Sequence, residues 1–217
     1  MSKIDSVKAL IFDIDGTLSS EVSWLKLTEG LGASVTKHSE IFEKYLQRKI
    51  PYTKAKGDLI NLWQSTGNAN KAYMSQMFSS WKLKDDANKV ISYLRSRYKI
   101  VLISGSVDLY VQTVADKLQI EDWYANTKLD WDNKDNLIDF HYFRDQALKK
   151  LRQFRHFKKK YSLVNRECAV VGDGDNELLL FQRVKVSVVV KKEKPHPELE
   201  PYTYKKIDKL TELKKIF

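Results

Sequence analysis

Three short apolar segments of the sequence each end at small polar or acidic residues, and this pattern constrains the fold more than any other feature. The segments are residues 9–12 before Asp-Ile-Asp-Gly-Thr, residues 100–103 before Ser-Gly-Ser, and residues 169–171 before Gly-Asp-Gly-Asp-Asn-Glu. Apolar runs that alternate with stretches of helical periodicity are typical of buried strands in a parallel sheet. The sequence therefore predicts an α/β fold with a doubly wound parallel sheet.

The polar strand ends predict a single site. In an open α/β sheet, ligands bind beyond the carboxyl ends of the strands. Asp13 and Asp15 are two residues apart, so both carboxylates face one side if strand geometry persists to this point. Gly16 permits a backbone conformation that a side chain would resist, and its N–H group is available to an anion. Ser104 and Gly105 provide a hydroxyl and a further N–H group at the second strand end.

The three motifs, in this order, resemble those of the haloacid dehalogenase superfamily of phosphohydrolases, and their layout is similar to its phosphoserine-phosphatase-like branch. The resemblance covers nearly the whole chain and implies a Rossmann-like core, a Mg²⁺ cofactor and a phosphorylated small-molecule substrate. It further implies that Asp13 attacks phosphorus to give an aspartyl-phosphate. Asp15 then protonates the leaving oxygen and later deprotonates the attacking water.

The resemblance also implies a metal site and a phosphate site. The expected magnesium ligands are Asp13, Asp15 through its carbonyl, Asp173 and Glu177. Members of the family usually have aspartate at the last position, so Glu177 either binds the metal through water or positions Asp173. Gly16, Ser104 and Gly105 are the expected phosphate donors.

The family also places a basic residue on the helix before the acidic loop, and two alignments are possible. Matching the helix start selects Arg144, which we prefer because it lies where the preceding strand gives way to helix. Counting back from Asp173 selects Lys149 or Lys150 instead.

Residues 19–84 have helical periodicity and are predicted to form a helical cap, inserted into a core of residues 1–18 and 85–217. An insertion at a strand end would cover the site. We expect Glu21 and Trp24 to select the substrate. Phosphoserine does not carry over as the substrate, because Glu21 is displaced by one position from the family's cap glutamate and Leu59 stands where an arginine aligns.

Other local patterns give further expectations. A hairpin is expected around residues 132–136, an N-terminal helix cap at Asp85 or Asp86, and a mostly exposed chain from Lys191 onward. Cys168, which precedes an apolar strand, is expected to be a buried structural thiol.

The 217 residues carry a formal net charge of +10, which suits phosphorylated metabolites and would also attract nucleic acid. No apolar run approaches the length of a membrane span, and we expect a cytoplasmic protein. The leading interpretation is a magnesium-dependent phosphomonoesterase. The alternatives are a polyanion-binding or RNA-binding protein that retains the site, and a phosphotransferase that uses an alcohol as acceptor. No pattern in the sequence indicates an oligomeric state.

Overall fold

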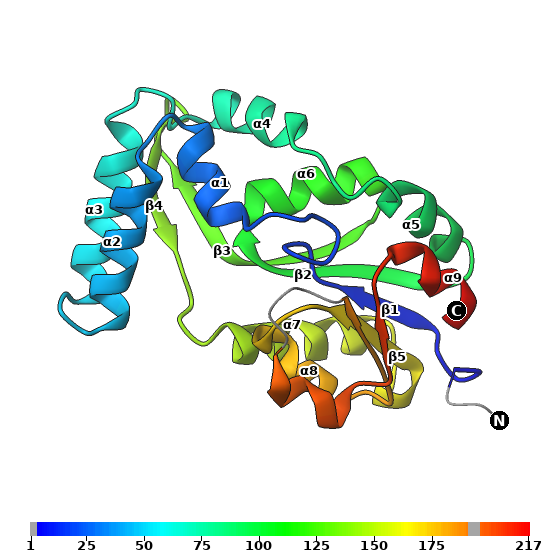
Figure 1. Cartoon of the computed structure of the whole chain (residues 1–217). Helices are drawn as coiled ribbons and strands as arrows, with labels where there is room; N and C mark the ends of the chain where they lie inside the picture. Colours follow the sequence, from blue (N-terminus) through cyan, green and yellow to red (C-terminus); the bar gives the residue numbers. More distant parts are fainter. Residues whose placement is uncertain (1–3, 191–195) are drawn as a thin grey trace.

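A seven-stranded sheet forms the centre of the protein (Figure 1). The computed structural model describes residues 4–190 and 196–217. The strand order is β4-β3-β2-β1-β5-β6-β7, and all neighbours are parallel except β3 and β4. The strands are β1 (Ala9–Phe12), β2 (Lys99–Val107), β3 (Asp122–Trp131), β4 (Leu137–His141), β5 (Cys168–Gly172), β6 (Val186–Val190) and β7 (Lys205–Ile207). The predicted α/β fold with a parallel sheet is confirmed.

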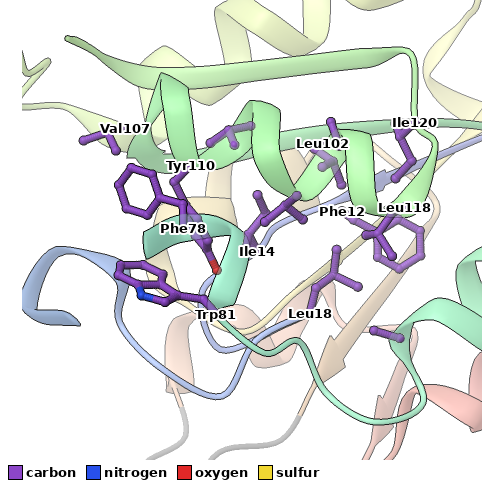
Figure 2. Packing of buried hydrophobic residues seen from close by; sticks show 14 of the residues in the cluster. Phe12, Ile14, Leu18, Phe78, Trp81, Leu102, Val107, Tyr110, Leu118 and Ile120 are labelled. Atoms are coloured by element: carbon purple, nitrogen blue, oxygen red, sulfur yellow. The ribbon is translucent and has the colours of Figure 1, made fainter. Parts of the chain in front are cut away.

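Helices cover both faces of this sheet, as Figure 1 shows. One face carries α5 (Ala87–Arg95) and α6 (Asp108–Leu118), and the other carries α7 (Gln146–Lys160) and α8 (Leu178–Phe181). Alternate side chains of β1 pack against the helices on opposite faces of the sheet, because successive residues of a strand point to opposite faces. Phe12 belongs to the first layer with Leu102 (Figure 2). Ile11 belongs to the second layer. A strand buried on both faces explains the unbroken apolar run that precedes Asp13.

Four helices lie between β1 and α5 in the sequence, in the segment predicted to be a helical cap. They are α1 (Ser23–Gly30), α2 (Val35–Leu46), α3 (Tyr52–Gln64) and α4 (Lys71–Ser80). Helices α2 and α3 lie at the end of the molecule that carries β4, where the Lys56 ammonium is 2.7 Å from the Asp139 carboxylate (Figure 1). Helix α4 packs on α6 through the rings of Phe78 and Tyr110, whose centroids are 5.4 Å apart (Figure 2). The segment is therefore attached to the sheet layer at two places.

The hairpin expected around residues 132–136 is confirmed, because β3 and β4 pair antiparallel across that turn. Cys168 is buried at the start of β5, as expected. No described helix has the length and apolar character needed to cross a bilayer.

One local expectation is wrong. Asp86 precedes α5 but does not cap it, because its backbone is helical rather than extended, and its carboxylate instead accepts a hydrogen bond from the Thr211 N–H group at 2.9 Å. The chain after Lys191 is mostly exposed where the structure describes it, as expected, although Ile207, Leu210 and Leu213 are buried against the sheet layer. These three apolar positions are separated by charged residues, so sequence periodicity alone did not distinguish them from a surface. Residues 191–195 lie outside the described residues.

Candidate functional site

Two strand ends bring the acidic residues together. Strands β1 and β5 pair in register, with Phe12 opposite Val171, so the residues that follow both strands emerge side by side. The Asp13 N–H group donates to the Val171 carbonyl at 3.1 Å, which extends the pairing to the first acidic residue. Carboxylate oxygens of Asp13, Asp173 and Glu177 lie within 4.8 Å of one another, and all three residues are buried. Coulomb repulsion among three buried carboxylates requires compensation by cations.

Lys150 supplies one compensating charge. Its side chain is fully buried, and its Nζ atom donates to Asp13 Oδ1 at 2.8 Å and to Asn176 Oδ1 at 2.7 Å. The same ammonium forms an ion pair with Glu177 Oε1. Burial alone would lower the pKa of Lys150, but the Asp13 and Glu177 carboxylates hold that pKa above its ordinary value. The ammonium is therefore charged at neutral pH.

Among the candidate bases, the structure brings Lys150 to the site and not Arg144, which corrects our preference. Arg144 is exposed ahead of α7, its guanidinium is 5.6 Å from the centroid of the Tyr45 ring, and it does not line the cavity that contains Asp13. Lys149 lies over Phe143, 5.8 Å from the ring centroid. Lys150 is in the second turn of α7, and helical side chains lean toward the N-terminus. A lysine that seemed too far along the helix can therefore reach the strand ends.

Glu177 holds the acidic loop in place. Its Oε2 atom accepts hydrogen bonds from the N–H groups of Gly174 at 3.1 Å and Asp173 at 3.4 Å. Burial raises the pKa of Glu177, and Lys150 opposes that rise. One carboxylate oxygen of Glu177 contacts Lys150 and the other accepts from two N–H groups. Of the two roles that the sequence left open, binding the metal through water or positioning Asp173, this geometry favours the second.

Asp15 is held by a residue that the sequence analysis missed. Its Oδ2 atom accepts hydrogen bonds from Ser23 N–H at 2.9 Å and from the Ser23 hydroxyl at 2.6 Å. The Ser23 hydroxyl is also 2.6 Å from that of Ser106. Burial and the neighbouring Asp13 charge raise the pKa of Asp15 to about 6, so it can exchange a proton near neutral pH. A serine at the start of α1 resembles an ordinary helix start, and its role became visible only in three dimensions.

The expected phosphate donors lie at the same strand ends. Gly16 has φ of +74°, in the left-handed region that favours glycine. Its carbonyl accepts a hydrogen bond from Lys84 Nζ at 2.9 Å. Ser104 is buried at the end of the regular part of β2, and Gly105 lines the cavity above it.

The two cap residues expected to select the substrate differ in placement. Trp24 lines the cavity, and its indole N–H lies 3.4 Å from the Gly105 carbonyl. Glu21 is outside the lining: its carboxylate is about half exposed and forms an ion pair with Lys26. Glu21 lies two residues before the start of α1 at Ser23.

A cavity of about 640 Å³ extends from Asp13, Asp15 and Asp173. Its remaining lining is largely apolar and aromatic, and includes Leu59 and Trp24. His38 also lines it and bonds to the Thr28 hydroxyl through Nδ1 at 2.6 Å. Burial lowers the pKa of His38 to about 4, so this imidazole is neutral at pH 7.

The donor set suits a hard divalent cation. Asp13 and Asp173 present buried carboxylate oxygens to one another, and no sulfur or imidazole belongs to this cluster. One lysine balances only part of the charge of three buried carboxylates. Oxygen donors of this kind match the preferences of Mg²⁺.

The family model described as haloacid dehalogenase-like hydrolase matches residues 7–185. A HAD family hydrolase from Salmonella enterica subsp. enterica serovar Typhi is similar in structure, with a TM-score of 0.74 and 16% identity over 93% of this chain and 67% of that chain. A phosphoserine phosphatase in the form of a phospho-aspartyl intermediate analogue has a TM-score of 0.72 and 18% identity, over 97% of this chain and 99% of that one. A substrate-bound phosphoserine phosphatase gives the same TM-score and identity, over 97% and 98%. No curated protein matches the chain.

The contact between Gly172 and Glu177 generates a stability prediction. A Cβ atom at Gly172 would lie 2.5 Å from Glu177 Cγ, whereas one at Gly174 would approach Glu177 Oε2 only to 3.8 Å. Because Glu177 is buried and bonded at both oxygens, Gly172→Ala is expected to lower the free energy of unfolding by about 2 kcal/mol, as for an overpacked core. Gly174→Ala is the matched control and should lower it by much less, as measured by urea denaturation. Equal effects of the two substitutions would contradict this account of Gly172.

Proposed function

The chain belongs to the haloacid dehalogenase-like hydrolase family, and on that premise we propose that it is a magnesium-dependent phosphomonoesterase that acts through an aspartyl-phosphate on Asp13. The observation that carries the proposal is the buried arrangement of Asp13 between Lys150 and Asp173, with Asp15 two residues further on. A nucleophile, a proton-transfer group and a fixed positive charge then meet beside a cavity large enough for a small ester.

Asp13, Asp173 and the Asp15 carbonyl are the groups proposed to hold Mg²⁺. When bound, the ion neutralises phosphate charge and polarises the phosphoryl oxygens. The Thr17 hydroxyl donates to Asp173 Oδ1 at 3.1 Å and so orients this carboxylate. Glu177 supports the site through the N–H groups of the acidic loop.

The first half-reaction transfers the phosphoryl group to the protein. An Asp13 carboxylate oxygen forms a bond to phosphorus as the bond between phosphorus and the ester oxygen breaks. Lys150 fixes the orientation of Asp13 through Oδ1. Asp15 gives its proton to the departing oxygen, and its raised pKa makes the protonated form available near neutral pH.

The second half-reaction returns the protein to its starting state. Asp15, now ionised, takes a proton from a water molecule whose oxygen attacks phosphorus, and the bond from phosphorus to Asp13 breaks. Inorganic phosphate leaves and Asp15 is protonated again. Ser23 holds Asp15 through two hydrogen bonds, so the same carboxyl group remains oriented for both proton transfers.

Asp13→Asn is the direct test of the nucleophile. The amide is nearly the same size but does not form an acyl phosphate, so turnover of 4-nitrophenyl phosphate with Mg²⁺ should fall to background. Circular dichroism and urea unfolding verify that the variant is folded. A residual rate above about one hundredth of the wild-type value would remove Asp13 from this role.

Removal of divalent cations tests the proposed metal. EDTA should abolish hydrolysis of 4-nitrophenyl phosphate, and excess Mg²⁺ should restore it. The control is a zinc chelator with low affinity for magnesium, which should leave the rate unchanged. Full activity in EDTA would contradict metal assistance.

Lys150→Gln tests the buried charge. Loss of the ammonium should lower kcat/KM for 4-nitrophenyl phosphate by about 10²- to 10³-fold, as for the loss of a fixed donor that stabilises a charged transition state. Lys149→Gln, one position away and directed at Phe143, is the matched control and should change it little. A larger effect at Lys149 would show that the wrong lysine has been assigned. Unfolding curves separate lost chemistry from lost structure.

A further inference from the structure

A second cavity, of about 610 Å³, adjoins the one above the acidic cluster. The two cavities have Tyr45, Tyr52 and Tyr142 in common, so they are continuous along one wall. The second cavity lies where the end of α2, the start of α3 and the segment after β4 come together. Its cationic lining, which we call the basic mouth, consists of Arg48, Lys49 and Arg144.

The basic mouth carries uncompensated positive charge. Within residues 4–190 and 196–217, no acidic residue lines this cavity and none of its three cations forms an ion pair. By contrast, Lys56 in the first cavity is paired with Asp139 at 2.7 Å. A cluster of unpaired cations beside a cavity attracts an anionic group of a ligand.

Aromatic rings connect the acidic cluster to the basic mouth. Trp24, whose indole N–H is 3.4 Å from the Gly105 carbonyl, has its ring centroid 5.9 Å from that of Tyr142. The Tyr142 and Tyr52 centroids are 6.5 Å apart, and those of Tyr52 and Tyr45 are 6.0 Å apart. The Arg144 guanidinium then lies 5.6 Å from the Tyr45 centroid. Such a row of rings offers apolar and π contacts to a flat molecule along its whole length.

We propose that the substrate is a phosphomonoester of a flat, unsaturated alcohol that carries a second anionic group. This inference rests on the proposed phosphatase activity. The ester phosphate lies at Asp13, the unsaturated body lies along the rings from Trp24 to Tyr45, and the basic mouth binds the distal anion through Arg144. Arg144 then acts on a second anion rather than on the reacting phosphate.

The dimensions and charges of the cavities support this substrate class over a small amino-acid ester. A serine-sized leaving group would leave most of a 640 Å³ cavity unfilled. Among the described lining residues, Lys56 is already paired with Asp139, and His196 lies 3.6 Å from a Glu198 carboxylate oxygen. His38 is neutral at pH 7 because burial lowers its pKa. A carboxylate held close to the reacting phosphate would therefore lack a free cationic partner among these groups, whereas one at the basic mouth would have three.

Two synthetic esters that differ only in the distal anion test the proposal. They are biphenyl-4-yl phosphate and 4′-carboxybiphenyl-4-yl phosphate. With Mg²⁺ at low ionic strength, the wild type should prefer the carboxylated ester by about tenfold in kcat/KM, the size expected for one charge-assisted contact. Arg144→Gln should reduce this ratio to near one. The matched control is Arg152→Gln, since Arg152 also lies over an aromatic ring, at 5.3 Å from the Phe143 centroid, but lines neither cavity. This control should keep the wild-type ratio.

The preference for the carboxylated ester is also measured without turnover. Titration calorimetry gives the dissociation constants of the two esters for the Asp13→Asn variant, and their ratio is compared with the tenfold expectation. Turnover of both esters with no preference in the wild type, or a preference that survives in Arg144→Gln, would overturn the second-anion site and leave the phosphatase assignment standing. Absence of turnover with a tenfold ratio of dissociation constants would overturn the phosphatase assignment and support the site. Loss of the preference at Arg152→Gln to the same extent as at Arg144→Gln would also overturn the proposal, because it would indicate general surface charge.

Discussion

The ion pairs of Lys150 with Asp13 and Glu177 are the interaction on which the rest of the site depends. Removing one partner of a buried ion pair leaves an uncompensated charge, which costs about 3–5 kcal/mol, so the acids and the lysine require one another. The lysine comes from α7, Asp13 from the end of β1, and Glu177 from the loop after β5. One buried ammonium thereby connects three elements that are distant in sequence, and it sets the position of α7 against the strand ends.

The charged groups of the site and the apolar lining of the cavity come from different parts of the structure. The strand ends hold the buried acids and the glycine backbone, and Lys150 reaches them from α7. The helical segment between β1 and α5 contributes mainly apolar and aromatic surface to the cavity, including Trp24 on α1. Ser23, which precedes Trp24, bonds to Asp15 in the core. Adjacent residues of one helix therefore connect the proton-transfer group to the lining of the cavity.

Much of this arrangement could be predicted from the sequence, because burial on both faces produces unbroken apolar runs and strand ends converge at one edge. For that reason the sequence predicts that Asp13, Asp15 and Asp173 lie near one another, and all three line one cavity in the structure. Lys150 was ranked below Arg144 because a sequence gives distance along a helix, whereas the direction of the side chain depends on backbone geometry. Ser23 and Glu21 differ by two residues, and only the start of α1 decides which one turns inward. The basic mouth combines the adjacent residues Arg48 and Lys49 with Arg144, which follows nearly a hundred residues later. No local pattern could have joined them.

Glu177 and Gly172 form a matched pair that explains how a longer acid is accommodated. The resemblance to the family leads one to expect aspartate at position 177, which would be too short to reach both Lys150 and the N–H groups of the loop at once. The extra methylene of glutamate needs space, and that space is where a Cβ of residue 172 would be. Because β5 ends at Gly172, the missing side chain costs little strand stability while it admits the Glu177 carboxylate beside Lys150. With one oxygen on Lys150 and the other on the loop N–H groups, the longer acid supports Asp173, which is consistent with the proposal that Asp13, Asp173 and the Asp15 carbonyl hold Mg²⁺.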